Sequence, residues 1–304
     1  MKQILIHTAG IVNKAILVFF CGLFLSVKGN AQEIAAFLAS MEQAKKPATY
    51  LRSEPLYECI YSFDINCDVH EVYSVVLQMG KDFNRFYDYS AYAVDSLSFS
   101  PDASADDVSQ IEERKLTSMF YFDSEVWQGL PNNAMTVVVE ASPNFMSYEE
   151  ELGAMEWTLE EGSETVCGYL CSKATTTYGG RDWTVWYAPD IPSTAGPWKF
   201  NGLPGLILAA KDSESLFEFK AITFRKGIVP VLKKEDAAIY QSTRDKVLKA
   251  KIVAENDVQN GKMPGPSEVR TISIHRTLDG NNIVYINGAA RRPRPNGYQP
   301  LELE

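Results

Sequence analysis

The stretch Gly196–Asp212, GPWKFNGLPGLILAAKD, places three glycines and two prolines among tryptophan, phenylalanine, leucine and isoleucine. Pro204 fixes its own φ and biases the residue before it toward an extended conformation. Gly202 and Gly205 can take positive φ or let another backbone approach closely. We therefore predict a tight turn that delivers the apolar residues Leu206–Leu208 into a buried strand, and a strongly bent chain around it.

The predicted turn has a structural interpretation and a ligand-binding alternative. It differs from a phosphate-binding loop because no Lys-Ser or Lys-Thr follows it and no helix begins there. A glycine turn can nevertheless form the floor of a pocket, so a ligand-binding loop stays open as the alternative. The residues of this structural motif are Gly202, Leu203, Pro204, Gly205, Leu206 and Ile207.

The first 31 residues have the pattern of a secretory signal. Lys2 and Lys14 precede or flank an apolar run, Ala15–Val27, and small residues follow it at Gly29–Ala31. The run is shorter than the roughly 20 residues that a helix needs to cross a bilayer. We expect cleavage near Ala31-Gln32, export to the periplasm or cell envelope, and no stable membrane span after cleavage. No repeat or long linker divides residues 32–304, which predicts a single domain.

The chain is acidic, with a formal net charge of −10. The signal segment holds three lysines and no acids, so its removal makes the remainder more acidic still. Binding to nucleic acid requires clustered lysine and arginine, so we expect no nucleic-acid partner. The one basic cluster, Arg291, Arg292 and Arg294, is interleaved with prolines and predicts a solvated turn.

The cysteines of residues 32–304 permit disulfides, because an even count in an exported chain is typical of them. The first two can face each other if a hairpin turns near residues 62–64. The last two are four residues apart, about 13 Å in a strand, and can pair only if the chain turns at Gly168. All three connectivities stay open. Their spacing lacks a histidine partner for zinc, so we expect no metal and no cofactor. The four residues are Cys59, Cys67, Cys167 and Cys171.

Alternating, aromatic and β-branched segments outnumber helical ones along the chain. We predict helices at Asp106–Leu116 and Lys233–Glu255 from their helix-forming composition and spacing. Strands before and after so few helices favour a mostly β, α+β fold: a curved antiparallel sheet, half-barrel-like, with two or so helices. Aromatic residues make up 12% of the chain, so large side chains should line the sheet. The predicted strands are Tyr57–Ile65, Thr136–Glu140, Trp183–Tyr187 and Leu216–Phe224.

One predicted strand carries the candidate ligand-binding residues. Within it, Trp183 and Tyr187 share a face, and Asp182 and Trp186 share the other. One aromatic set can line a cavity in which Arg181 and Asp182 anchor a polar ligand. The alternative is an internal ion pair beside an ordinary aromatic core. The candidate residues are Arg181, Asp182, Trp183, Trp186, Tyr187 and Trp198.

Three stretches of the sequence resemble one protein family. GLPGLIL, Gly202–Leu208, is the motif of the GLPGLI proteins of Bacteroidetes bacteria, and Tyr169–Leu208 resembles that family's central block. LQMGKDFNRFYDYSAYAVDS, Leu77–Ser96, resembles its N-terminal strand pair, and YQPLELE, Tyr298–Glu304, is similar to its usual ending. The resemblance implies an exported, β-rich protein of unestablished function, found near outer-membrane transport genes, with no catalytic residues to assign.

The sequence offers little catalytic chemistry. Neither His70 nor His275 belongs to a zinc-hydrolase or serine-hydrolase motif. The consecutive acids Glu149–Glu151 would point to alternate faces of a strand. We therefore expect a non-enzymatic exported protein that binds an apolar or peptide-like ligand, or an outer-membrane transporter or other envelope partner. The alternative is an envelope hydrolase that acts on peptide or glycan through Asp182 and Asp190.

Overall fold

The computed structural model describes residues 50–98, 104, 122, 124–235, 238–276, 282–291 and 293–303. The predicted signal segment and the predicted helix at 106–116 lie outside them. The chain divides into Met1–Thr49 and Tyr50–Glu304, and every described residue belongs to the second unit. In the described part, no helix is both long and apolar enough to cross a membrane.

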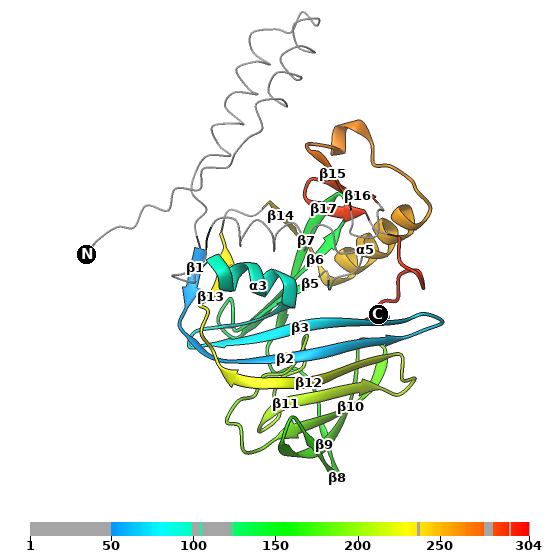
Figure 1. The fold of residues 1–304 in the computed structure, drawn as a ribbon. Coiled ribbons are helices and arrows are strands. Elements are labelled where there is room, and N and C mark those ends of the chain that lie inside the picture. Colours follow the sequence, from blue (N-terminus) through cyan, green and yellow to red (C-terminus); the bar gives the residue numbers. More distant parts are fainter. Residues whose placement is uncertain are drawn as a thin grey trace, which may run out of the picture. The chain divides into compact units, whose positions relative to one another are not determined.

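Twelve strands form one large sheet, and all neighbouring pairs are antiparallel except β14 and β7 (Figure 1). This is the mostly β, α+β architecture that the sequence predicts. In sheet order the strands are β14 (Ile239–Gln241), β7 (Asn144–Glu151), β6 (Ala134–Ala141), β5 (Ser124–Gln128), β4 (Asn84–Asp88), β3 (His70–Gly80), β2 (Pro55–Asn66), β12 (Phe217–Lys226), β11 (Leu206–Asp212), β10 (Arg181–Ala188), β9 (Tyr169–Tyr178) and β8 (Thr158–Val166).

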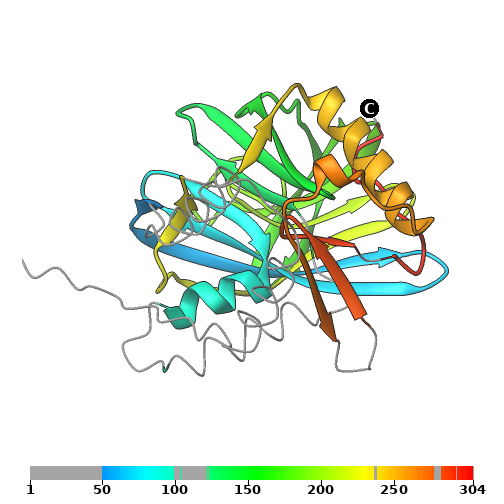
Figure 2. The same ribbon diagram turned by 90° about the horizontal axis from the view of Figure 1, so that it is seen from above.

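The sheet curls strongly toward one side. Strand β7 is second and β9 eleventh in the order, yet the Tyr178 hydroxyl on β9 donates to Glu150 Oε2 on β7 at 2.9 Å. The two ends of the sheet therefore approach each other across its concave face, although the sheet is not closed into a barrel. Seen from above, the strands curve around this face (Figure 2).

Two small sheets and a 3₁₀ turn complete the described strands. Strand β1 pairs with β13 antiparallel, and β16 lies between β15 and β17. Their bounds are β1 (Tyr50–Ser53), β13 (Val231–Lys234), β15 (Ile272–Arg276), β16 (Asn282–Ile286), β17 (Ala289–Arg291) and η1 (Pro266–Glu268).

Helix α3, Tyr89–Ser98, follows β4 directly. The Asp88 carboxylate accepts hydrogen bonds from two backbone amides of its first turn, which is how an aspartate favours a helix start. On the outer face of the sheet, the Tyr92 hydroxyl donates to Glu58 Oε2 at 2.8 Å. The stretch Leu77–Ser96, which we compared with a strand pair, is therefore the end of β3, then β4, then most of α3.

Helix α5, Arg244–Gln259, packs against β6 and β7. The predicted helix at Lys233–Glu255 is wrong in the described residues before Arg244, where β13 ends and β14 lies. Strand β14 pairs in parallel with β7, and this contact between distant segments overrides the local helical preference. Thr243 is still extended, and its carbonyl accepts the first helical bond from Val247 N at 3.0 Å.

The predicted strands are confirmed in β2, β6, β10 and β12, but the hairpin expected near residues 62–64 is wrong. Strand β2 continues to Asn66, and the turn to β3 follows it. Across this longer hairpin Cys59 pairs with Leu77, so it does not face Cys67.

All four cysteines of the described residues are free thiols. The chain does turn at Cys167 and Gly168, which have φ of 51° and 84°. Cys171 lies beyond this turn, buried in β9. The structure therefore has the turn that a Cys167–Cys171 bond requires without showing that bond.

Candidate functional site

The segment between β10 and β11 folds back into the concave side of the sheet. Trp198, Phe200 and Leu203 are each 2% exposed or less. The Phe200 ring meets Trp183 of β10 edge-on, with ring centroids 4.9 Å apart, and lies 6.5 Å from Phe219 of β12. Aromatic contacts of this geometry stabilise beyond simple burial. The segment thus supplies much of the core that the curved sheet encloses.

Glycine is required where this segment passes the end of β10. A Cβ atom on Gly205 would lie 2.3 Å from the Ala188 carbonyl oxygen. Gly202 has a φ of +99°. The chain turns here and enters β11, whose first residues, Leu206–Leu208, are fully buried. The turn and the buried strand lie where the glycines and Pro204 predict them.

Hydrogen bonds fix the backbone of the segment inside the sheet. Gly202 N donates to Thr194 O at 2.8 Å, and Ile207 N donates to Ala195 O at 3.0 Å. The Gln128 side-chain amide on β5 donates to the carbonyls of Gly196 and Trp198, both at 3.3 Å. These bonds satisfy buried backbone groups that a loop normally leaves to water.

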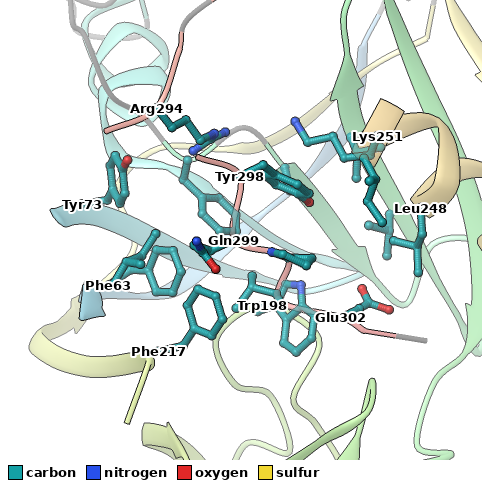
Figure 3. Close-up of a pocket in the computed structure, with 18 of the residues that line it drawn as sticks. Phe63, Tyr73, Trp198, Phe217, Leu248, Lys251, Arg294, Tyr298, Gln299 and Glu302 are labelled. Carbon is teal, nitrogen blue, oxygen red and sulfur yellow. The ribbon is translucent and has the colours of Figure 1, made fainter. Parts of the chain in front are cut away.

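The C-terminal residues 298–303 cross the open side of the sheet (Figure 3). Arg181 Nε donates to Leu301 O at 3.2 Å, and Arg181 Nη2 donates to Pro300 O at 3.1 Å. Leu303 N donates to Gly179 O at 2.8 Å. The sheet therefore holds this segment largely through its backbone, as many bound peptides are held.

The Glu302 side chain is the charged anchor of the segment and is 6% exposed. Its carboxylate lies 2.8 Å from Lys199 Nζ and 2.6 Å from Arg244 Nη2, and it accepts a hydrogen bond from the Tyr148 hydroxyl at 3.0 Å. Lys199 is fully buried and also pairs with Glu150 at 2.8 Å. Two cations thus meet two carboxylates, the balance that a buried charge cluster needs.

We call the surface that holds residues 298–303 the C-terminal groove. It is formed by Tyr148 and Glu150 of β7, Tyr178 of β9, Arg181 of β10, Lys199 of the buried segment and Arg244 of α5.

The two tyrosines of the groove act as hydrogen-bond donors over a wide pH range. Burial raises the pKa of Tyr148 well above its usual value, and the nearby Glu302 and Glu150 raise it further. Burial and the same two carboxylates also raise the pKa of Tyr178. Burial alone would lower the pKa of Arg244, but Glu302 and Glu150 raise it overall. The groove therefore presents phenol donors and a guanidinium to the carboxylates that lie in it.

Little empty space remains beneath the C-terminal segment. The cavity there has a volume of about 60 Å³ and is lined by side chains such as Phe63, Phe217 and Trp198 (Figure 3). Such a volume admits a few waters, whereas ligand pockets measure roughly 300–1,000 Å³. The concave side is thus filled by the chain's own residues.

The structure separates the six residues predicted to bind a ligand. The alternation in β10 is as predicted: Trp183 and Tyr187 are buried on the concave side, while Asp182 is exposed and bonds Thr177 Oγ1 at 2.6 Å. Trp186 is half-buried and packs against the main core cluster. Only Arg181, Trp183 and Trp198 lie near the C-terminal groove.

Arg181 and Asp182 do not share a cavity in which both could anchor a ligand. Arg181 is buried, and its Nη1 lies 3.3 Å from Asp212 and 3.1 Å from Glu214 instead. Neighbours in a strand point to opposite faces, so one side chain enters the core and the other meets solvent.

The carboxylates proposed for hydrolysis do not converge. Asp182 lies at the start of β10 and Asp190 just beyond its end, and both are exposed. Paired acid–base catalysis requires two carboxyl groups at one cleft. Nor, in the ranges that the structure describes, is there a group of three or more His, Cys, Asp or Glu side chains that could hold a metal ion.

The sequence does not predict several residues of the C-terminal groove, because they come from segments that are far apart in the chain. The one local signal is Lys199, a lysine between Trp198 and Phe200 in an otherwise apolar stretch. A buried lysine requires counter-charges. Nothing in the sequence identifies them as Glu150 and Glu302.

Fold and site together define a class of protein: a β-rich, open half-barrel that holds a peptide segment at its mouth. The model of a family described as "Protein of unknown function (Porph_ging)", which is associated with Bacteroidetes, matches residues 179–209. The match covers the loop before β10, all of β10 and the buried segment through Gly202–Leu208. Over this short part the chain is similar to that family.

Solved structures with a similar fold include two of one protein. They bear the titles "Structure of PNGF-II in C2 space group" and "Structure of PNGF-II in P21 space group". The first is 14% identical with a TM-score of 0.45, and the match covers 77% of this chain and 40% of that chain. The second is 12% identical with a TM-score of 0.44 and covers 76% and 40%. This chain thus spans less than half the length of those relatives. No curated protein matches the chain.

Proposed function

We propose that this chain is a non-enzymatic, exported protein of the cell envelope that binds an acidic, peptide-like segment in the C-terminal groove. One observation carries the proposal: the groove already holds such a segment, residues 298–303 of the chain itself. A site that binds one peptide by its backbone and one carboxylate has the chemistry to bind another of similar sequence.

The groove recognises few features of its occupant. Arg181 binds two consecutive backbone carbonyls, which any peptide offers. Lys199, Arg244 and Tyr148 bind one carboxylate two residues after the first of those carbonyls. Charge-assisted hydrogen bonds of this kind are stronger and more selective than neutral ones. The preferred ligand is therefore a peptide with a single buried glutamate.

The structure favours a peptide in the C-terminal groove over an apolar small molecule in the interior of the sheet. The aromatic side chains that we expected to line a cavity pack against Phe200 and its neighbours, and only about 60 Å³ remains. Support for export is the signal-like sequence of the first 31 residues. The resemblance of Gly202–Leu208 to the GLPGLI family adds support for an envelope role, with an outer-membrane transporter as the candidate partner that donates the peptide.

The test is binding of the C-terminal peptide in trans. A chain that ends at Gly297 is titrated with a labelled peptide, Tyr298–Glu304, and with the same peptide carrying Glu302→Gln. We expect saturable binding of the parent peptide and at least roughly tenfold weaker binding of the variant, because the variant loses bonds to charged groups.

A second design avoids dependence on the shortened chain. A protease site inserted after Gly297, where an added Cβ meets nothing within 4 Å, allows the segment to be severed in the folded protein. Labelled parent peptide should then exchange into the groove. Failure of the peptide to bind either the shortened chain, if folded, or the severed protein would refute the proposal. Equal binding of the parent peptide and the peptide that carries Glu302→Gln would also refute it.

A further inference from the structure

A cleft of about 790 Å³ lies on the outer face of the main sheet, and we call it the outer cleft. Arg85 of β4 and Trp127 of β5 are cross-strand partners in it. Their neighbours Phe86 and Val126 point the other way, into the concave core. The volume is in the range of small-molecule sites, roughly 300–1,000 Å³. Other walls come from β7, β13 and β16, through Phe145, Leu232, Lys233 and Tyr285.

Two buried N–H groups of residues that line the outer cleft, Trp127 Nε1 and Arg85 Nε, have no hydrogen-bond acceptor in the described part of the chain. Trp127 is 3% exposed, and the rest of the Arg85 guanidinium is engaged, with Asp95 at 2.8 Å and Glu125 at 2.7 Å. Buried donors in folded proteins nearly always have partners. Two unpaired donors on adjacent strands therefore indicate a place for an acceptor group.

Lys233 adds a second positive charge beside the Trp127 ring. Its Nζ lies 5.4 Å from the Trp127 ring centroid, and the Arg85 guanidinium carbon lies 5.7 Å from that centroid. Among the described residues Lys233 forms no ion pair, whereas Arg85 has two carboxylates. Burial lowers the pKa of Lys233, and the charge of Glu149 offsets this only in part. An anion beside Lys233 would compensate its charge.

The remaining walls of the outer cleft combine carboxylates with apolar side chains. The carboxylates are those of Asp88, Asp95, Glu125 and Glu140, and the apolar side chains include Val138, Phe145, Leu232 and Ile239. A ligand that fills the cleft therefore needs an apolar body in addition to an acceptor head.

We propose that the outer cleft binds an amphipathic carboxylate, an apolar body such as an acyl chain that ends in a carboxylate group. The carboxylate accepts hydrogen bonds from Arg85 Nε and Trp127 Nε1 and pairs with the Lys233 ammonium. The apolar body lies along Phe145 and Leu232. This site is separate from the C-terminal groove, so it does not depend on the function proposed for that groove.

Decanoate, below its micelle concentration, is the probe. It is titrated into the full chain and followed by calorimetry and by tryptophan fluorescence. Trp127→Phe keeps an aromatic ring and removes the N–H, and Lys233→Gln removes the charge. We expect saturable binding to the parent, and each variant should bind about tenfold more weakly or worse, since each loses a bond to a charged group. Lys246→Gln, at an exposed position of α5, is the control and should bind within about twofold of the parent.

Decanol, which has the same chain length without the charge, completes the test. It should bind at least about tenfold more weakly than decanoate. The proposal is wrong if decanoate shows no saturable binding, if both variants bind it as tightly as the parent, or if decanol binds as well. Thermal unfolding verifies that the variants are folded. If Trp127→Phe is not, Lys233→Gln, at a half-buried side chain, decides the outcome.

Discussion

Gly205 shows how one residue determines the path of a whole segment. The chain must leave β10, enter the concave side and return as β11 beside the strand it left. At the return point its backbone touches the end of β10 so closely that no side chain fits. The sequence pattern Gly-Leu-Pro-Gly predicts such a turn, because glycine permits close approach and proline stiffens the chain around it.

Gly205→Ala should therefore be strongly destabilising. The new Cβ would lie 2.3 Å from Ala188 O and 2.6 Å from its carbonyl carbon, and these are backbone atoms that cannot rotate away. We expect a loss of about 3 kcal/mol or more in the free energy of unfolding, at or above the usual cost of overpacking. Urea denaturation measures it.

Gly153→Ala is the matched control. Gly153 has a φ of +85°, but a Cβ there would meet nothing within 4 Å. It should cost only the backbone strain, about 1–2 kcal/mol. A Gly205→Ala variant as stable as Gly153→Ala would contradict the role assigned to the close approach.

At the scale of elements, local patterns predict the strands and tertiary contacts decide the exceptions. The alternation of side chains between the two faces predicts strands β10 and β12 directly from the sequence. Strand β14 does not, because its three residues are extended only through pairing with β7. Helix α3 is not among the predicted helices. Asp88 is a recognisable helix cap, but the stretch that contains it, Leu77–Ser96, resembles a strand pair of the GLPGLI family.

The role of the C-terminal segment as the occupant of the groove is the feature that the sequence predicts least. Its anchor, Glu302, meets Lys199, and these two residues are brought together only by the curl of the sheet. The sequence therefore predicts the half-barrel and its buried turn, but not the charge cluster at its mouth. The cluster depends on four segments meeting, which no local spacing reports.

Glu302→Gln tests how far this segment stabilises the fold. Removing one partner of a buried ion cluster leaves the other charges without compensation, and such losses cost about 3–5 kcal/mol. Because Lys199 keeps Glu150, we expect about 3 kcal/mol, measured as the shift in the urea midpoint.

Glu214→Gln is the comparison for that variant. Glu214 also pairs with an arginine of the groove, Arg181, at 3.1 Å, but its side chain is 72% exposed. An exposed pair contributes at most about 1 kcal/mol. Equal losses of unfolding free energy in the two variants would show that the burial of Glu302 does not determine its contribution to stability.

The whole molecule carries a pH dependence that follows from its buried tyrosines. Burial raises the pKa of Tyr148 and Tyr178, and burial together with Glu58 raises the pKa of Tyr92 to about 12. The unfolded chain ionises its tyrosines near pH 10. Below that pH their contribution to stability is fully present, and it is lost as pH rises from about 10 through the folded pKa values.

We therefore expect the melting temperature to fall steeply above about pH 10, together with a late rise in tyrosinate absorbance. Tyr178→Phe, which removes one ionisable phenol from the groove, should reduce the steepness. Ionisation of every tyrosine near pH 10 in protein that remains folded would contradict the burial of these hydroxyls.

Residues 196–208 lie folded inside the curved sheet, and amide hydrogen exchange of the native protein tests this placement directly. The amides of Gly202 and Ile207, which donate to Thr194 O and Ala195 O, should exchange as slowly as those of the central strands. Exchange of these amides at the rate of an unstructured peptide would show that the segment lies in solvent, and the interior would then have to be filled in another way.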